Sequence, residues 1–550
     1  MKTIKQQTAF CRPDRAQYRI GEPVRILFSS ASGVPAVTSI RVFLLQREID
    51  CNWTQEDGVI MLAPLEPGNY GLSVVSEDGV FETAFDVVES AKSVIRYGFL
   101  SDFSPEDDDL ADVDWLCRLH VNAVQFYDWM YRHDRLISPE EEYLDPIGRS
   151  SSLRTIRQKI DACRSRGMRA FAYGAVYAAT KETVSSQPDW AAYTMDGDPM
   201  VFADWLNYMN ISPNNGWSQY IVNEFRSAVE TLGFSGIHLD TYGFPKRIYA
   251  HNGTRVSFED VFLPLINAAQ DAVSSVDAEN GVIFNAVNDW PTERIAQGKQ
   301  DAQYIEVWPP HDTYHDLYWL IQKAKRLAPE KSVVLAAYMK PFQHATDGES
   351  IAKAEHAFCL ANAVILASGG IQLVHGEEES VLCDSYYVNH AKVRPQFTGT
   401  VVRYADFLVR YAQLLYDDKG YDVSMTAGGG INEDVIATAD HAVFSADGRP
   451  DTVWMMLRES ANRIVIHLIN LTGNDALWNT PKNQPQTVSE IRLSLRLDAE
   501  ITGVYHASPD LESLGAVKLP FLTRSSAYGR IQEITLPELC YFSTIWIEWE

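Results

Sequence analysis

Residues 233–243 read GFSGIHLDTYG, and this stretch decides the predicted fold because a short apolar run in it ends on a carboxylate. The run GIHLDT, from residue 236, has the length of a buried strand. Inside such a strand, a carboxylate would need a partner or a shifted pKa. At the carboxyl end of the strand, Asp240 would instead stand where α/β barrels present side chains to a substrate. A purely structural role for Asp240, as the cap of the next helix, stays open.

Similar apolar runs recur along the middle of the chain. Eight strands are predicted: YGFLSDF from residue 97, AVQFYDW from 123, MRAFAYGAVY from 168, GIHLDT from 236, GVIFNAV from 281, YIEVW from 304, SVVLAAYM from 332 and GGIQLVHGE from 369. Helical patterns lie between them, and two, over 153–163 and 221–232, stop at Gly167 and Gly233. Apolar strands that alternate with helices form a parallel sheet covered on both faces. Eight such units favour a (β/α)₈ TIM barrel over a doubly wound sheet, and no Gly-rich phosphate loop follows the first strand.

Short strand patterns with turn residues between them flank this region on both sides. Residues 1–92 contain runs such as YRIGEPVRILFSS and PGNYGLSVVSEDG, which predict a small N-terminal β-sandwich. We expect the barrel to occupy residues 93–422. Residues 423–550, with runs such as RIVIHLINLTG, predict a C-terminal β-sandwich.

Composition and charge exclude several classes of partner. The 550 residues carry a formal net charge of −26 and no basic stripe, so we expect neither nucleic acid nor an anionic membrane as a partner. No run reaches the roughly 18 apolar residues of a membrane span, and the N-terminus has no apolar core of a signal peptide. We therefore expect a cytoplasmic protein, or a secreted one if a signal peptide has been lost. The seven scattered cysteines are expected to be free thiols, and the oligomeric state cannot be predicted.

The other predicted strands also end on polar and aromatic residues. Strand six, YIEVWPP, ends on Glu306, which gives the rim a second carboxylate beside Asp240. A retaining glycosidase needs such a pair about 5 to 5.5 Å apart, in which one carboxylate attacks the anomeric carbon and the other, with a raised pKa, protonates the leaving oxygen. Rings that stack on sugars and polar groups that bond hydroxyls would complete the site. The candidate substrate-binding residues are Tyr127, Asp128, Trp129, His133, Tyr173, His238, Asn285, Trp308, Tyr338 and Glu377.

No cofactor and no metal site are predicted. His311 and His315 have the i, i+4 spacing of a helical metal pair. No third ligand is evident, and Pro309 and Pro310 precede them. We therefore expect these histidines to have no metal.

The motifs resemble glycoside hydrolase family 66, the dextranases and cycloisomaltooligosaccharide glucanotransferases. The resemblance rests on FLSDF at 99–103, NAVQFYDWMYRHD at 122–134, GFSGIHLDTYG at 233–243 and YIEVWP at 304–309. It implies an immunoglobulin-like domain, a barrel and a C-terminal sandwich, in that order. It also implies a retaining mechanism with Asp240 as nucleophile and Glu306 as general acid/base. Family members cleave α-1,6-glucosidic links in dextran or transfer the glycosyl unit to form cyclic products.

Within that family, the resemblance favours a dextranase-like hydrolase. Cyclising members carry a carbohydrate-binding insertion between strand seven and its helix, and too few residues separate Met339 from Gly369 for such a module. His238 and Leu239 depart from the residues expected near the nucleophile of a typical dextranase. Long dextran and short isomaltooligosaccharides both remain open as substrates.

Three alternatives stay open. A cycloisomaltooligosaccharide-forming transglycosylase would use the same covalent intermediate. An amylase-like barrel resembles this one, but it needs acids on strands five and seven, which here end FNAVND and AAYMKP. A non-catalytic α-glucan-binding protein would keep the barrel and show no turnover.

Overall fold

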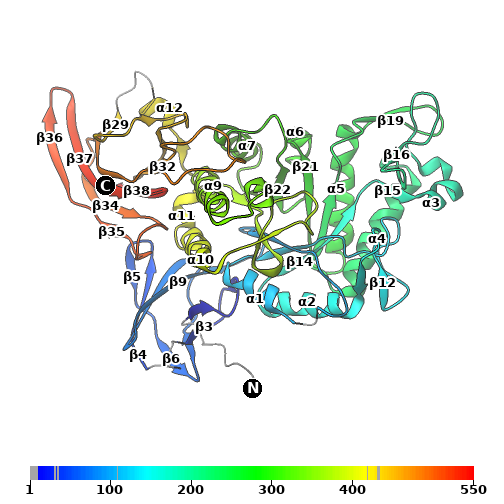
Figure 1. Ribbon diagram of the computed structural model, residues 1–550, viewed down its shortest axis with the longest axis horizontal. Coiled ribbons are helices and arrows are strands. Elements are labelled where there is room, and N and C mark those ends of the chain that lie inside the picture. Colours follow the sequence, from blue (N-terminus) through cyan, green and yellow to red (C-terminus); the bar gives the residue numbers. More distant parts are fainter. Residues whose placement is uncertain (1–9, 30–32, 34–35, 108, 418, 430–433) are drawn as a thin grey trace.

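A computed structural model describes residues 10–29, 33, 36–107, 109–417, 419–429 and 434–550. A central α/β barrel is joined to one β-sandwich at each end of the chain (Figure 1). The two sandwiches also touch one another, since Gln46 hydrogen-bonds Glu548 and Trp546. All seven cysteines are free, as predicted.

The barrel is built from eight parallel strands. They are β10 (Tyr97–Leu100), β11 (Ala123–Phe126), β14 (Arg169–Ala175), β18 (Gly236–Asp240), β21 (Gly281–Val287), β22 (Ala302–Glu306), β23 (Ser332–Ala336) and β24 (Ile371–Gln372). They pair in the order of the sequence and form a nearly closed sheet. The predicted strands and barrel are therefore confirmed. The doubly wound alternative is wrong, because that fold requires a reversal of strand order.

Helices cover the outside of the barrel. They include α1 (Ala111–Arg118), α2 (Leu153–Ser165), α4 (Gly216–Leu232), α5 (Phe258–Ser274), α7 (Tyr314–Leu327), α9 (Gly348–Ala367) and α10 (Pro395–Arg410). Helix α4 ends at Gly233 as predicted, with φ 85° in the left-handed region that favours glycine. Gly236 then opens β18 at φ 156°, where a Cβ would lie 2.0 Å from the carbonyl oxygen of Gly281. This close approach sets β18 beside β21.

Among the described helices, α9 is long and apolar enough to cross a membrane, judged by length and composition alone. The helix contains Glu349, Lys353 and Glu355, so it is not an uninterrupted apolar run, and the prediction about such runs stands. Of its most apolar window, 72% is buried inside the protein. A helix that is apolar on all sides is typical of a large protein core, and α9 packs there.

Each sandwich consists of two sheets. The N-terminal sheets are β1 (Phe10–Pro13), β3 (Val24–Ser29), β7 (Val59–Leu62) and β6 (Trp53–Glu56), and β2 (Tyr18–Arg19), β9 (Gly79–Val88), β8 (Gly68–Ser76), β4 (Val37–Leu44) and β5 (Arg47–Ile49). The C-terminal sheets are β28 (Tyr421–Asp422), β31 (Val453–Ser460), β32 (Arg463–Asn470), β38 (Phe542–Trp549), β34 (Ile501–Ala507) and β35 (Val517–Lys518), and β29 (Val435–Thr438), β33 (Val488–Arg496), β37 (Gly529–Leu539) and β36 (Phe521–Ser526). The first C-terminal strand therefore begins two residues before the predicted boundary at 423.

Asp406 of α10 joins the N-terminal sandwich to the barrel. Its carboxylate accepts hydrogen bonds from Thr83 Oγ1 (2.9 Å), from both terminal nitrogens of Arg118 (3.1 and 3.0 Å) and from His120 Nε2 (2.8 Å). Burial raises the pKa of Asp406, but the charge of Arg118 and the bond from His120 outweigh it, so the pKa lies well below its usual range. The carboxylate is therefore ionised and paired in the interior.

Asp406→Ala should lower the free energy of unfolding by about 3 to 5 kcal/mol, because Arg118 would keep a buried charge without its partner. Denaturant unfolding followed by circular dichroism measures this. Asp161→Ala is the control, since Asp161 pairs with Arg164 at the surface and its side chain is 73% exposed. An equal effect of the two changes would contradict the role of Asp406.

Candidate active site

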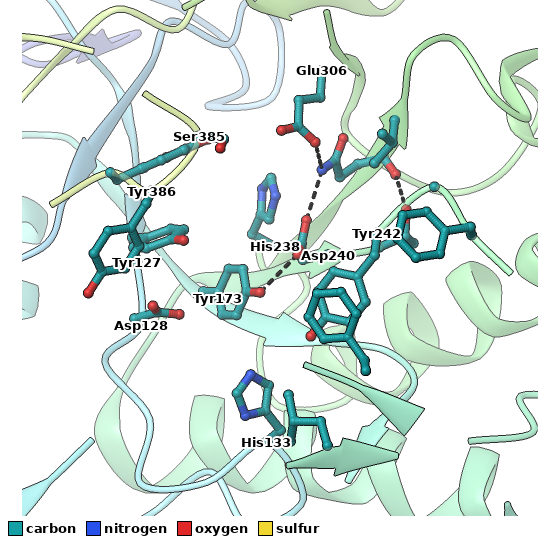
Figure 2. Close-up of a pocket in the computed structure, with 18 of the residues that line it drawn as sticks. Tyr127, Asp128, His133, Tyr173, His238, Asp240, Tyr242, Glu306, Ser385 and Tyr386 are labelled. Atoms are coloured by element: carbon teal, nitrogen blue, oxygen red, sulfur yellow. Dashed lines mark hydrogen bonds between the residues drawn. The ribbon is translucent and has the colours of Figure 1, made fainter. Parts of the chain in front are cut away.

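A cavity of about 720 Å³ opens at the carboxyl ends of the barrel strands (Figure 2). Asp240, the last residue of β18, and Glu306, the last residue of β22, both line it. Eight of the predicted substrate-binding residues line it as well: Tyr127, Asp128, His133, Tyr173, His238, Asn285, Trp308 and Tyr338. Most of the residues predicted from strand ends thus meet in one place.

Asn285 bridges the two carboxylates. It lies on β21, the strand between β18 and β22. Its Nδ2 donates to Oδ1 of Asp240 (2.8 Å) and to Oε2 of Glu306 (2.9 Å). Because both oxygens bind the same nitrogen, the distance between them is at most the sum of these two hydrogen-bond lengths. That limit is below the roughly 6.5 Å at which the separations of inverting glycosidases begin.

A different tyrosine hydroxyl binds the second oxygen of each carboxylate. Tyr173, on β14, donates its hydroxyl to Oδ2 of Asp240 (2.8 Å). Tyr338, just after β23, donates to Oε1 of Glu306 (2.7 Å). Both carboxylates are therefore held at both oxygens, which fixes their orientation before any substrate arrives.

Burial raises the pKa of both acids, and the charge of Glu306 raises that of Asp240 further. Burial has the largest effect on Asp240 and the charge of Glu306 adds to it, so the pKa of Asp240 rises to about 7. Burial also raises the pKa of Glu306, although the bonds from Asn285 and Tyr338 oppose it. The raised pKa of Glu306 agrees with prediction. Since like charges this close do not ionise together easily, the pair retains one proton up to about neutral pH.

Asp128 and His133 form a polar wall on the other side of Tyr173, which Figure 2 shows between Asp128 and Asp240. Burial raises the pKa of Asp128 to about 7 and lowers that of His133 to about 4. The Nδ1 atom of His133 is buried and has no hydrogen-bond partner among the described residues. Both side chains therefore retain polar atoms that can bond the hydroxyls of a sugar.

Aromatic rings line another part of the cavity. The ring of Tyr127 stacks on Tyr387 with centroids 4.3 Å apart. Nδ1 of His238 hydrogen-bonds the hydroxyl of Tyr97 (3.0 Å), and burial lowers the pKa of His238 to about 3. The imidazole next to the carboxylates is therefore neutral and adds no charge to them.

Two predicted substrate-binding residues, Trp129 and Glu377, do not line the cavity, contrary to prediction. Trp129 is fully buried, and its indole N–H donates to the carbonyl oxygen of Tyr173 (3.1 Å). Asp128, with a positive φ of 52°, turns the chain so that the next side chain enters the core. Glu377 is 3% exposed and accepts the backbone N–H groups of Ser101 (2.6 Å) and Asp102 (3.0 Å).

Glu377 belongs instead to a buried acidic group with Asp107 and Asp112, whose oxygens lie close enough together to hold a metal ion. The ammonium of Lys159 lies among them, 3.4 Å from Asp112 and 3.6 Å from Glu377, and it also hydrogen-bonds Asp107. The charge of Lys159 offsets one carboxylate charge, and burial raises the pKa of Glu377 well above its usual range, so the group is an ion-pair cluster in this structure. His315, one of the two histidines with metal-pair spacing, stacks on Trp454.

Several aromatic residues of the cavity wall were not predicted from the sequence. They include Phe202, Trp205, Tyr242, Phe244, Trp290 and Tyr386. Tyr242 and Trp290 follow strands four and five directly, so their positions at strand ends could have indicated them. Trp205 lies in the turn between two short paired strands, β16 (Val201–Phe202) and β17 (Leu206–Tyr208), and Tyr386 lies in an irregular connection, and no sequence signal marks either residue.

Comparisons with known proteins agree with the observed fold. A cycloisomaltooligosaccharide glucanotransferase of Niallia circulans is 26% identical over an alignment of 613 positions, which covers 85% of this chain and 62% of the relative. A dextranase of Streptococcus salivarius is 22% identical over 470 residues, covering 72% of this chain and 55% of the relative. The chain thus spans less than two thirds of the length of either protein.

Among solved structures, a Paenibacillus cycloisomaltooligosaccharide glucanotransferase complexed with cycloisomaltoheptaose has a TM-score of 0.88 at 23% identity, over 98% of this chain and 99% of that chain. This likeness shows that the two proteins share a fold. The sequence profile described as Glycosyl hydrolase family 66 matches residues 13–546. Since that match covers nearly the whole chain, the protein belongs to glycosyl hydrolase family 66.

Proposed function

We propose that this protein is a retaining glycoside hydrolase that cleaves α-1,6-glucosidic links in dextran or isomaltooligosaccharides through a covalent glycosyl-enzyme intermediate. The bridge from Asp240 through Asn285 to Glu306 carries the proposal, because carboxylates this close leave no room for a water between one of them and the sugar. The named activities of the two relatives, a cycloisomaltooligosaccharide glucanotransferase and a dextranase, support the α-1,6-glucan substrate.

In the proposed reaction, the pair gives up its proton in the first step and regains one from water in the second. Asp240 attacks the anomeric carbon while Glu306 gives its proton to the departing glycosidic oxygen, so one C–O bond forms as the other breaks. Glu306, now ionised, then takes a proton from water. The water oxygen attacks the same carbon and releases Asp240. Two inversions in sequence retain the α configuration.

The choice between water and a sugar hydroxyl in the second step separates hydrolysis from cyclisation. The alignment with the Niallia relative runs over 613 positions but covers 85% of the 550 residues here, so the relative has many residues with no counterpart in this chain. Between β23 and α9, the chain forms one short helix, α8 (Lys340–Gln343). This short connection supports hydrolysis, since the resemblance associates cyclisation with an insertion there.

The two phenols provide a test of the proposed roles. A hydrogen bond to a carboxylate favours its ionised form and lowers its pKa. Tyr173→Phe should therefore raise the pKa of Asp240 and move the acid limb of the kcat/KM profile up by about one pH unit. Tyr338→Phe should raise the pKa of Glu306 and move the basic limb up by a similar amount. Each variant is the control for the other, and exchanged limbs would mean that the roles are reversed.

The substrate is tested by reducing-sugar release and product length from dextran, isomaltooligosaccharides, starch and pullulan. Cleavage of the α-1,6-glucans by the wild type and not by Asp240→Asn is the expected result. Long products from dextran would indicate internal cleavage, and activity confined to short chains would indicate oligosaccharide trimming. No activity on any α-glucan would overturn the proposal.

A further inference from the structure

A segment of the C-terminal sandwich lies against the loop that leads out of the active site. This segment, residues 475–482, belongs to the connection between β32 and β33, which runs from the sandwich toward α7 (Figure 1). The loop, residues 307–313, joins β22 to α7. The backbones pair across the interface: the N–H of Tyr314 donates to the carbonyl oxygen of Ala476 (2.8 Å), and that of Trp478 to the carbonyl oxygen of Asp312 (3.0 Å).

Two buried side chains fix the segment 475–482. Trp478 is 2% exposed, and its indole N–H donates to the carbonyl oxygen of His311 (2.8 Å). Lys482 is 1% exposed, and its ammonium hydrogen-bonds Asp475 (2.5 Å) and Thr480 (2.7 Å). Because Lys482 binds the other end of the same segment, the segment meets the loop in one fixed conformation.

From that contact, hydrogen bonds continue into the active site. The N–H of His311 donates to the carbonyl oxygen of Trp308 (3.0 Å). Asn288 donates through Nδ2 to the carbonyl oxygen of Pro309 (2.9 Å) and through its backbone N–H to that of Glu306 (2.7 Å). Trp308 lines the cavity, and its interaction with Glu306 lowers the pKa of that carboxyl group. The loop that Trp478 holds thus carries the cavity residue Trp308 and begins directly after Glu306.

We propose that residues 475–482 position the loop 307–313 for catalysis, and that Trp478 is a positioning residue of an active site in another domain. The inference rests on the proposed role of Glu306 as acid/base. If the C-terminal sandwich only stabilised the barrel, it would need no buried contact with this particular loop. The C-terminal sandwich is therefore part of the catalytic apparatus without touching substrate.

Trp478→Phe and Trp546→Phe form a matched pair for the test. Trp546 is also buried in the C-terminal sandwich, and its indole N–H also donates to another domain, at Gln46 (3.2 Å), away from the loop. Each change keeps an aromatic ring and removes one hydrogen bond across a domain interface. A loss of stability alone should therefore affect both variants, and a loss of positioning should affect Trp478→Phe only.

The expected kinetic result is a roughly tenfold lower kcat on dextran for Trp478→Phe, with a smaller change in KM, because the catalytic pair is misplaced after binding. The basic limb should move to higher pH, since the interaction with Trp308 lowers the pKa of Glu306 and would be weakened. The titratable groups facing Glu306 are Asp240, Tyr304, Tyr338 and Tyr387, and neither variant changes them. Trp546→Phe should leave kcat and the pH profile as in the wild type.

Amide hydrogen exchange tests the contact without activity. Residues 307–314 should exchange faster in Trp478→Phe than in the wild type, and at the wild-type rate in Trp546→Phe. Lys482→Met, which frees the segment from Asp475, should do the same and serves if Trp478→Phe does not fold. Unchanged exchange in both Trp478→Phe and Lys482→Met, or equal kinetics of Trp478→Phe and Trp546→Phe, would overturn the inference. An inactive wild type would count against the proposed function alone.

Discussion

Asp240→Asn should lower kcat on α-1,6-glucan by at least about four orders of magnitude, because the amide cannot form the covalent bond to the anomeric carbon. The change is nearly isosteric, and the amide oxygen can still accept the hydrogen bond from Asn285. The fold and the affinity for isomaltooligosaccharides should therefore persist. Reducing-sugar release measures the first effect, and calorimetric titration with an isomaltooligosaccharide measures the second.

Asp128→Asn is the matched control for this prediction. Asp128 also lines the cavity, and burial raises its pKa to about 7, as for Asp240. In the proposed site, Asp128 bonds substrate hydroxyls, so its amide should mainly raise KM and retain measurable turnover. If Asp128→Asn abolished turnover and Asp240→Asn did not, the nucleophile would be misassigned.

Glu306→Gln should lower kcat on dextran by about 10² to 10⁴-fold, because the glycosidic oxygen would leave without a proton. The loss should depend on the leaving group. An aryl isomaltooligosaccharide with a good leaving group needs no proton to depart, so its first step should remain fast and the covalent intermediate should accumulate. Rapid-quench measurement of aryl release would show this as a burst.

Azide provides the control for that second variant. It attacks the anomeric carbon as an anion and needs no general base, so it should restore turnover of the aryl substrate by Glu306→Gln and give an α-glycosyl azide. The wild type should gain little from azide. An equal loss on dextran and on the aryl substrate, with no effect of azide, would contradict the acid/base role of Glu306.

The barrel and the two carboxylates could be predicted because they depend on simple patterns. Apolar runs separated by helical periodicity identify parallel strands, and parallel strands bring their carboxyl ends to one rim. Asp240 and Glu306 could therefore be placed in one site although 66 positions separate them in the sequence. The bridge by Asn285 follows from the same order, since its strand lies between the other two.

The walls of the cavity could not be predicted in the same way. Trp205 and Tyr386 come from connections whose path depends on tertiary contacts and not on periodicity. The inward turn of Trp129 depends on the positive φ of Asp128, which sequence alone does not reveal for a residue other than glycine. The contact of Trp478 with His311 joins two domains, and neither local sequence contains a sign of the other.

The anomeric configuration of the first products tests the proposed mechanism most directly. Proton NMR of an isomaltooligosaccharide digest, recorded within minutes and before mutarotation, identifies the anomer formed at the new reducing end. Double displacement through Asp240 and Glu306 predicts that the α anomer appears first and the β anomer only as mutarotation proceeds. The β anomer appearing first would mean that water attacks the glucan directly, and the covalent role of Asp240 would then be wrong.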